Sequence, residues 1–247
     1  MTGLAAHPAG RPMWSASDAD ALNRLYEGRA ADALCDVLTD PAFGSAALVS
    51  SFGADSAVLL HMAAQVRRNV PVLFVETGWL FAQTLSYADD LAGYLRLSDV
   101  RWLKPDSVTL DAMDPKRLRW SYDPDGCCDL RKVQPLDPAL ADFDLWISGR
   151  KSHQNRTRAT LLLFEQDGAR LKLNPLHDWT SVDIAGYAAA HRLPPHPLVA
   201  EGYPSIGCSP CTSRVQPGED PRAGRWRGWD KSECGIHKPS DDGEPAF

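Results

Sequence analysis

The sequence predicts an α/β protein built on a parallel sheet with helices on both faces. Two observations carry this prediction. Short apolar runs alternate with helix-forming stretches along most of the chain, and most of these runs are apolar at consecutive rather than alternate positions. Strands of that kind are buried on both sides, which requires helices above and below the sheet. The 247 residues, 44% of them hydrophobic, suffice for one substantial core, and we find no internal repeat.

The expected elements follow one another in a simple order. Residues 15–38 form the first expected helix, which Ser15 or Ser17 can cap, and Cys35 is expected in the core beneath it. Thr180 and Asp183 are placed to form a capping box at the start of the last helix. The expected strands are 46–49, 71–75, 100–103 and 145–147, and the later helices are 57–68, 80–95 and 184–191.

Composition divides the chain into three parts. Residues 1–14 are expected to be a disordered lead-in, because they are rich in Ala, Gly and Pro and lack the apolar block of a secretory signal. Residues 15–211 form a single α/β domain. Residues 212–247 are rich in Gly, Pro and charged residues, which predicts a mobile segment. Because this segment also contains Trp226, Trp229 and Cys234, we expect it to close over a ligand or a partner.

Charge and hydropathy disfavour several classes of protein. A net charge of -6 and a pI near 5.6 disfavour a nucleic-acid binder, which usually presents a basic face. No apolar run approaches the roughly 20 residues that span a bilayer. Six cysteines without a secretory signal indicate a reducing cytoplasm, where thiols serve metal binding or catalysis more often than disulfides. The sequence leaves the oligomeric state open, a homo-oligomer included.

Small and polar residues follow three of the predicted strands, at residues 50–56, 77–78 and 148–149. The carboxyl ends of parallel strands meet at one edge, where ligands of such sheets bind, so these residues are expected to share a crevice. In the first loop Gly53 permits a tight turn, and the next helix N-terminus favours an anion. The hydroxyls of Ser50, Ser51 and Ser56 can donate to it. The Gly-Lys-Ser/Thr ending of common NTPase loops is missing.

Five cysteines fall into three groups: the pair Cys127-Cys128, the pair Cys208 and Cys211, and the single Cys234. The first four make a complete ligand set for a soft metal. Zinc ligands are usually separated by two to four residues, whereas contiguous cysteines fit the larger body of a four-iron cluster more easily. Spacing alone leaves an iron–sulfur site, a zinc site and buried free thiols open.

Cys234 and the basic residues form a second pattern. A cysteine with an ordinary pKa is only a few per cent thiolate at neutral pH, so a nucleophilic thiol benefits from nearby positive charge. Arginine binds oxyanions through paired donors and lysine binds them as a point charge, which predicts a multiply charged anionic ligand. The basic residues near the motifs are Arg131, Lys132, Arg150, Lys151, Arg156, Arg158, Arg222, Arg225 and Lys231.

Together these motifs resemble those of assimilatory sulfonucleotide reductases, and among them the iron–sulfur type that acts on adenylylsulfate (APS). One departure is Asp55, where many relatives carry Gln or Glu, because an acidic group near a phosphate is unfavourable unless it points away or caps the helix. The joint occurrence of the cysteine pair, Cys-x-x-Cys and Glu-Cys-Gly-x-His is highly specific. The matching stretches are residues 50–56, 76–78, 127–132, 207–212, 217–226 and 233–237.

The resemblance implies a fold, a cofactor and a set of site residues. The fold is the adenine-nucleotide α-hydrolase-like (PP-loop, ATP-pyrophosphatase) type. The cofactor is a [4Fe–4S] cluster on Cys127, Cys128, Cys208 and Cys211, and Cys234 is the catalytic nucleophile. The implied substrate-binding residues are Ser50, Ser51, Phe52, Gly53, Ser56, Thr77, Gly78, Lys132, Gly149, Arg158, Arg222, Arg225 and His237.

The implied reaction converts APS to sulfite and AMP in assimilatory sulfate reduction toward cysteine biosynthesis. Cys234 attacks the sulfuryl sulfur to form an S-sulfocysteine, and thioredoxin or a glutaredoxin-like protein then releases sulfite. Three alternatives stay open. The substrate can be the 3′-phosphorylated form, PAPS. The protein can be a PP-loop enzyme that thiolates tRNA with ATP, or a non-enzymatic iron–sulfur redox sensor, which has no use for a nucleotide loop.

Overall fold

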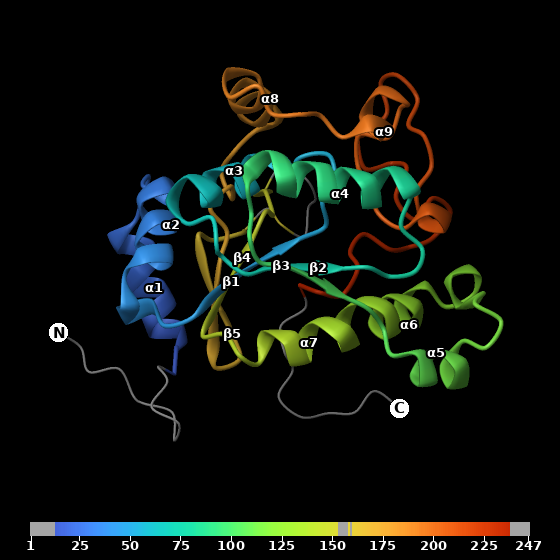
Figure 1. Cartoon of the computed structure of the whole chain (residues 1–247), viewed down its shortest axis with the longest axis horizontal. Coiled ribbons are helices and arrows are strands. Elements are labelled where there is room, and N and C mark those ends of the chain that lie inside the picture. The colour runs from blue at the N-terminus through green and yellow to red at the C-terminus, as the bar shows by residue number, and fades with distance from the viewer. Residues whose placement is uncertain (1–12, 153–157, 159, 238–247) are drawn as a thin grey trace.

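A six-stranded, mostly parallel sheet forms the centre of the computed structural model, which describes residues 13–152, 158 and 160–237 (Figure 1). Most of the expected lead-in, Arg156 and the last ten residues, 238–247, lie outside these described residues. The strand order is β3-β2-β1-β4-β6-β5, and only β5 is antiparallel to its neighbour. The strands are β1 (Ala46–Ser50), β2 (Val72–Val75), β3 (Val100–Leu103), β4 (Leu145–Ser148), β5 (Phe164–Asp167) and β6 (Arg170–Leu173).

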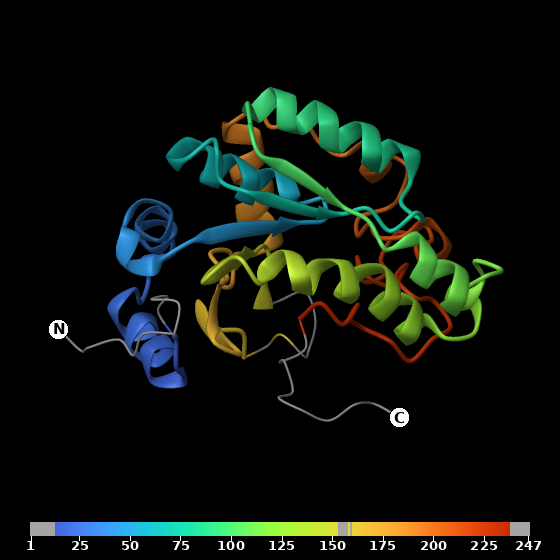
Figure 2. The same cartoon turned by 60° about the horizontal axis from the view of Figure 1, so that its bottom comes forward.

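Helices cover both faces of this sheet, as the sequence predicts (Figures 1 and 2). One side carries α3 (Ser56–Val66), α4 (Ala82–Leu95), α8 (Ser181–Ala190) and α9 (Pro197–Ala200), and the other carries α5 (Ser107–Met113), α6 (Pro124–Cys128) and α7 (Gln134–Leu140). At one end, α1 (Ala16–Leu25) packs on β5 and α2 (Ala30–Thr39) packs on α3. None of the helices in the described part of the chain is long and apolar enough to cross a membrane.

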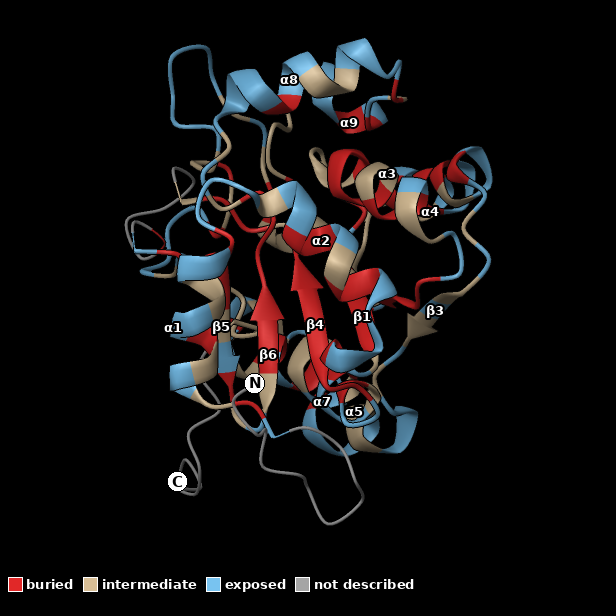
Figure 3. Ribbon diagram, turned by 90° about the vertical axis from the view of Figure 1, so that its left-hand side faces the viewer, coloured by how far each residue is buried: buried red, intermediate tan, exposed pale blue. Residues whose placement is uncertain are grey.

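Alternate residues of the central strands belong to two separate hydrophobic clusters. Figure 3 shows β1, β4 and β6 buried along most of their length. Leu48, Phe74 and Ile147 belong to the cluster under α3 and α4. Leu73 and Trp146 belong to the cluster under α7. Successive side chains of a strand point to opposite faces, so a strand covered on both sides must be apolar at consecutive positions. This double burial explains the continuous apolar runs in the sequence.

The first expected helix is two helices, because the chain turns at Gly28, which has a φ of +68°. On α2 the buried positions Ala33, Leu34, Val37 and Leu38 form one stripe. Cys35 lies outside this stripe and is exposed, so the expectation that it belongs to the core was wrong.

The expected capping box of α8 is confirmed. The Asp183 N–H donates to Thr180 Oγ1 at 3.2 Å, and the Thr180 N–H donates to the Asp183 carboxylate at 2.8 Å. Ser15 forms a second box with Asp18 at the start of α1, which identifies Ser15 rather than Ser17 as the cap.

Candidate active site

Three loops meet at the carboxyl ends of the central strands. The strands β2, β1 and β4 are neighbours in the sheet. Ser50 is in register with Phe74 and Val49 with Ser148, so the loops that follow these strands begin at similar heights. The structure thus brings residues 50–56, 77–78 and 149 to one edge of the sheet, where ligands of parallel sheets bind.

The first loop turns at Phe52. This residue has a φ of +46°, its N–H donates to Ser50 Oγ at 3.1 Å, and its buried ring packs edge-on against Phe74 at 4.9 Å. Gly53 does not take a left-handed conformation but begins the next turn, in which the Ser56 N–H donates to the Gly53 carbonyl at 3.1 Å. A left-handed backbone at an aromatic residue is strained and persists only where its surroundings impose it, a feature common at binding sites.

Asp55 precedes α3 but does not cap it with its side chain. Its carboxylate instead lies 3.0 Å from Nζ of Lys151, a buried residue of the loop after β4. The acidic charge near the anion loop is therefore compensated, and the ion pair links the first loop to the third.

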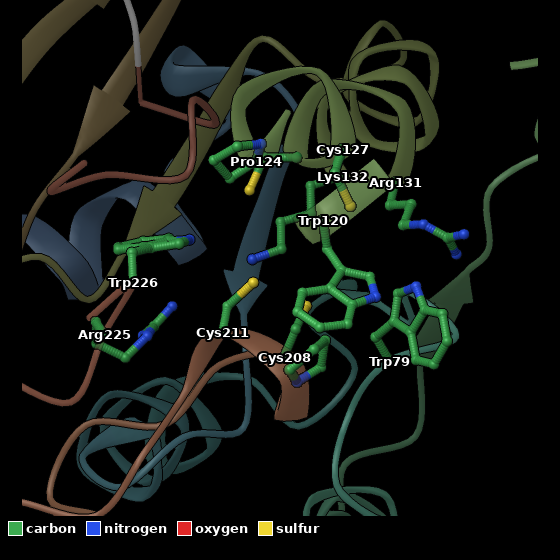
Figure 4. A pocket seen from close by; sticks show the side chains of 12 residues that line it. Trp79, Trp120, Pro124, Cys127, Arg131, Lys132, Cys208, Cys211, Arg225 and Trp226 are labelled. Atoms are coloured by element: carbon green, nitrogen blue, oxygen red, sulfur yellow. The ribbon is translucent and has the colours of Figure 1, made fainter. Parts of the chain in front are cut away.

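Four cysteines line one pocket (Figure 4). Cys127 and Cys128 end α6, whereas Cys208 precedes a single 3-10 turn, Ser209–Cys211, and Cys211 ends it. The other lining residues are Trp79, Trp120, Pro124, Arg131, Lys132, Pro210, Arg225 and Trp226.

A helix explains how adjacent cysteines reach the same pocket. The α6 helix continues into a π-helical turn, Asp129–Val133, and then into α7. Cys127, Cys128, Arg131 and Lys132 stand at positions i, i+1, i+4 and i+5, which share one side of a helix, and all four line the pocket. Isolated π turns of this kind are frequent at functional sites.

Three of the four cysteines, Cys127, Cys128 and Cys208, are buried, and one polar side chain contacts one of them. Thr77 Oγ1 is 3.2 Å from Cys208 Sγ, so this hydroxyl contacts the cysteine pocket. Burial raises the pKa of Cys127 to about 12, with Cys128 adding to the shift, and burial raises that of Cys128 to about 11. Four thiolates could therefore coexist here only with compensating positive charge. Within the described chain, no three His, Cys, Asp or Glu side chains are placed to hold a single metal ion.

Six cationic side chains lie within electrostatic reach of one another, and we call them the cation cluster: Lys132, Arg150, Lys151, Arg158, Arg222 and Arg225. Two of them, Lys132 and Arg222, also interact electrostatically with Cys234. Burial lowers the pKa of Arg222, and Arg158 and Arg225 lower it further, as expected for crowded like charges. Burial alone would lower the pKa of Lys132, but the sulfurs of Cys208, Cys234 and Cys128 outweigh it and raise it. Lys132 therefore lies within electrostatic reach of both the cysteine pocket and Cys234.

Three carboxylates of the described residues pair with the cation cluster: Asp55 with Lys151, Glu165 with Arg150, and Glu233 with Arg158. Six cations against three carboxylates leave a local excess of positive charge. This excess belongs to the cation cluster itself, because the groove that Cys234 lines on its other side carries Asp125, Asp129, Asp137 and Asp167.

The Arg225 side chain is fixed by its neighbours. Its Nη1 donates to the Ile206 carbonyl at 3.1 Å, and its guanidinium lies 4.5 Å from the centre of the Trp226 ring. A Cβ added to Gly207 would lie 2.2 Å from Nη2 of Arg225. Glycine at position 207 thus makes room for this arginine, a role that the sequence did not reveal.

Residues 212–226 pack against the cysteine pocket. Thr212 and Arg225 form a β-bridge, and the buried Trp226 donates its backbone N–H to the Cys211 carbonyl at 3.0 Å. Beyond this anchor, Cys234 lines a groove with α7 and the β5–β6 hairpin. The His237 ring stacks on Trp146 with a centroid distance of 5.6 Å, and burial lowers its pKa far below the usual value, with Lys172 and Arg150 adding to the effect.

One buried ion pair was not anticipated. Arg131 Nη2 donates to the Asp114 carboxylate at 2.8 Å and Nη1 donates to the Thr77 carbonyl at 2.9 Å. It thereby connects the cysteine helix to the loop after β2. Nothing in the sequence distinguishes Asp114 from the other acidic residues, because its partner is 17 positions away.

Comparisons with known proteins agree with this arrangement. Residues 45–214 match the family described as phosphoadenosine phosphosulfate reductase domain. A protein of Mesorhizobium japonicum named adenosine 5′-phosphosulfate reductase is 52% identical over 77% of this chain and 75% of its own length. A protein of the same name from Chelativorans sp. (strain BNC1) is 46% identical over 96% of each chain.

Solved structures confirm the fold. The crystal structure of phosphoadenylyl-sulfate (PAPS) reductase from Candida auris has a TM-score of 0.68 and 24% identity, covering 82% of this chain and 98% of its own. Yeast FAD synthetase in complex with FAD has a TM-score of 0.53 and 15% identity, covering 81% of this chain and 70% of its own. The adenine-nucleotide α-hydrolase-like (PP-loop) fold is thus confirmed. With its sequence match extending over most of its length, the chain belongs to the phosphoadenosine phosphosulfate reductase family.

Proposed function

We propose that this protein reduces APS to sulfite and AMP in assimilatory sulfate reduction. The observation that carries the proposal is the position of Cys234 beside the cation cluster, whose cations outnumber their carboxylate partners. The sulfur of a phosphosulfate is surrounded by negative oxygens that repel an approaching thiolate. A local excess of positive charge removes this obstacle, and the relatives named for APS indicate the substrate.

In the first half-reaction the Cys234 thiolate attacks the sulfuryl sulfur. A bond forms between the two sulfur atoms, and the bond from the sulfuryl sulfur to the bridging oxygen breaks, with its electron pair leaving on AMP. Lys132, Arg222 and Arg225 neutralise the charge that develops, where one well-placed donor contributes about 3 kcal/mol. Residues 50–56, Thr77, Gly78 and Gly149 line the side from which the nucleotide enters.

In the second half-reaction a dithiol protein, thioredoxin or a glutaredoxin-like protein, attacks Cys234 Sγ. Sulfite leaves with the electron pair of the bond between the two sulfurs, and the second thiol of the partner resolves the mixed disulfide. Cys234 returns as a thiol, and the partner supplies both electrons. The groove that Cys234 lines with α7 provides an approach for the attacking thiol, and movement of the C-terminal segment would expose Cys234 further.

A [4Fe–4S] cluster fits the pocket of Cys127, Cys128, Cys208 and Cys211. Two thiols project from one helix face and two lie at the ends of a short turn, and Lys132, Arg131 and Arg225 complete the lining. The thiolates that such a cluster needs would be stabilised by its iron. When bound, the cluster would tune the electrostatic environment of Lys132. The six free cysteines are consistent with a reducing cytoplasm.

The proposal is tested by mass spectrometry of the cluster-loaded protein mixed with APS in the absence of a reductant. We expect a sulfo adduct on the peptide that contains Cys234. The Cys234→Ser variant should form no adduct and release no sulfite while retaining the brown colour of the cluster. Loss of the cluster with retained turnover in this variant would reverse the roles of the cysteines.

The alternatives to this function are distinguished by three further measurements. PAPS in place of APS tests the phosphorylated substrate, and the faster adduct formation identifies the preferred one. Release of AMP and pyrophosphate from ATP in the presence of tRNA would support a thiolating enzyme instead. Failure to bind any adenine nucleotide would favour a redox sensor.

A further inference from the structure

The residue before Cys234 forms a bidentate ion pair. The Glu233 carboxylate accepts hydrogen bonds from Arg158 Nε at 2.6 Å and from Arg158 Nη2 at 2.8 Å. Arg158 is only 8% exposed. Arg222 adds a hydrogen bond from Nη2 to the Ser232 carbonyl at 2.9 Å and lies 3.9 Å from the same carboxylate. Two arginines of the cation cluster therefore hold the backbone and the side chain that lead into Cys234.

The members of the cation cluster differ in whether they pair with a carboxylate of the protein. Arg158 presents the paired donors that a phosphosulfate would need, yet Glu233 occupies them. Among the described residues, Lys132 and Arg225 pair with no carboxylate, and Arg225 donates only to a backbone carbonyl. Lys132 and Arg225 are thus placed to meet an anionic substrate, whereas Arg158 meets the protein's own carboxylate.

The segment that carries Cys234 depends on such contacts for its position. Its upstream anchor is the buried Trp226, and Gly228 follows with a φ of +87° and no atom within 4 Å of an added Cβ. Beyond Gly228, Lys231 pairs with Asp125 and Glu233 pairs with Arg158. On the other side of Cys234, Ile236 packs against the hydrophobic cluster under α7 and His237 stacks on Trp146. Between the anchors at Trp226 and His237 the chain has few apolar side chains, so these ion pairs fix where the thiol points.

We propose that Glu233 and Arg158 form a latch that positions Cys234 at the substrate site and opens before the reductant attacks. In the substrate-free protein Arg158 is then a positioning residue, and Glu233 occupies the paired donors that the resemblance assigns to the substrate. The use of the latch in two half-reactions rests on the proposed function. The latch itself belongs to the protein without substrate and can be tested there.

The first experiment measures alkylation of Cys234 in the cluster-loaded, substrate-free protein. Iodoacetamide labelling is followed by mass spectrometry, with the exposed Cys35 as the reference thiol in the same molecule. Glu233→Gln and Arg158→Gln should each raise the labelling rate of Cys234 relative to Cys35 by about ten- to a hundredfold, the range of an equilibrium held by a charge-assisted bidentate contact. Unchanged rates in both variants would overturn the latch.

The pair of variants also excludes a purely electrostatic effect on the thiol. Removing the Glu233 charge favours the thiolate and speeds labelling, whereas removing the Arg158 charge disfavours it and slows labelling. Opening of a latch speeds labelling in both variants. Opposite changes would therefore overturn the proposal. The labelling rate of Cys234 is also recorded as a function of pH. A changed pKa of the thiol shifts the midpoint of this curve, whereas greater accessibility raises its plateau at high pH.

The second experiment separates the two half-reactions. Glu233→Gln should slow formation of the sulfo adduct from APS without changing the dissociation constant of APS. It should not slow sulfite release from the preformed adduct by reduced thioredoxin. Adduct formation that is as fast in Glu233→Gln as in the wild-type protein would contradict the latch. Absence of any adduct in the wild-type protein would contradict the proposed function while leaving the labelling result valid.

A matched control lies in the same segment. Arg227 holds Glu219 with two hydrogen bonds, at 3.1 and 2.9 Å, in a solvent-exposed pair away from Cys234. Glu219→Gln should leave both the labelling and the half-reactions unchanged. Arg158→Lys keeps the positive charge but cannot donate two parallel hydrogen bonds to the carboxylate. Its labelling rate should lie between those of the wild type and Arg158→Gln. Equal labelling of all these variants would contradict the latch.

Discussion

At the scale of single residues, the site depends on residues that make space for an arginine side chain or neutralise its charge. Gly207 is required by its contact with Arg225 rather than by an unusual backbone conformation. Asp114 is required by Arg131, because an arginine buried without a partner would carry the full cost of desolvation. The sequence shows the motif residues but not these supporting pairs, because their partners come from distant segments.

Gly207→Ala should displace the Arg225 guanidinium, because the new methyl group would overlap Nη2. We expect kcat/KM for APS to fall by roughly ten- to a hundredfold, somewhat less than the loss of a whole charge-stabilising donor. Steady-state kinetics measure the effect. Gly186→Ala is the matched control, since an added Cβ there meets no atom within 4 Å. Unchanged kinetics in Gly207→Ala would show that Arg225 does not contact the substrate.

Asp114→Asn should lower the free energy of unfolding by about 3–5 kcal/mol, the usual cost of breaking a buried ion pair. The two side chains are 1% and 4% exposed. Asp99→Asn provides the comparison, because Asp99 and Arg101 form a pair that is 33% and 46% exposed and should contribute less than about 1 kcal/mol. Denaturant unfolding compares the variants. Equal losses would mean that burial does not set the cost.

At the scale of elements, the pattern of apolar runs predicted the central strands but missed the β5–β6 hairpin. Its residues Asp167 and Lys172 are buried, although such side chains are usually exposed. Trp146 explains both, because its Nε1 donates to Asp167 at 2.8 Å and its ring lies 4.4 Å from the Lys172 ammonium. Only the neighbouring strand makes this hairpin compatible with the core.

The junction of α9 with α4 contains a histidine whose role is fixed by geometry. The Leu198 N–H donates to His196 Nδ1 at 3.2 Å, so this nitrogen carries no proton. The other nitrogen, Nε2, is then protonated and donates to Thr84 Oγ1 at 3.1 Å. Burial lowers the pKa of His196 to about 4. Protonation of Nδ1 would remove the cap of α9.

This arrangement predicts a loss of stability in mild acid. The pKa of His196 is lower in the folded state than the value near 6.5 of the unfolded chain. Its contribution is therefore fully present above pH 6.5 and is lost as the pH falls toward 4. We expect a loss on the order of 2–3 kcal/mol, measured by denaturant unfolding between pH 7 and pH 4.

His196→Asn is the control for this pH dependence. The asparagine oxygen can accept from Leu198 and cap α9, but it does not titrate. Subtracting the pH profile of the variant from that of the wild type isolates the histidine. A difference that stays constant between pH 7 and 4 would contradict the assignment.

At the scale of the whole molecule, charge is unevenly distributed, because a positive region lies within a chain whose net charge is negative. The chain has a net charge of -6, yet the cation cluster lies beside the one thiol proposed as the nucleophile. Such a local field attracts an anionic substrate while the acidic remainder of the surface repels anions elsewhere. The overall charge therefore disfavours a general nucleic-acid binder but is compatible with an anionic ligand.

The field predicts a salt dependence of substrate capture. Between about 0.01 and 0.15 M salt the Debye length falls from roughly 30 to 8 Å, so kcat/KM for APS should fall at least a few-fold. Labelling of Cys234 provides a control that is independent of the reaction. The rate with anionic iodoacetate should fall with salt, whereas the rate with neutral iodoacetamide should change little. Equal salt responses of the two reagents would contradict the predicted field.

The sequence by itself determined the parallel α/β class, the central strands, the loop after β1 and the grouping of the five cysteines. These features follow from local periodicity and from spacing along the chain. The tertiary structure decided which cations lie beside Cys234, that Glu233 pairs with Arg158, and that Gly207 and Asp114 support the arginines. It also placed the left-handed residue of the first loop at Phe52 and exposed Cys35. The reason is physical: pairing, clearance and burial depend on the distances between segments that are remote in sequence, and no local pattern encodes those distances.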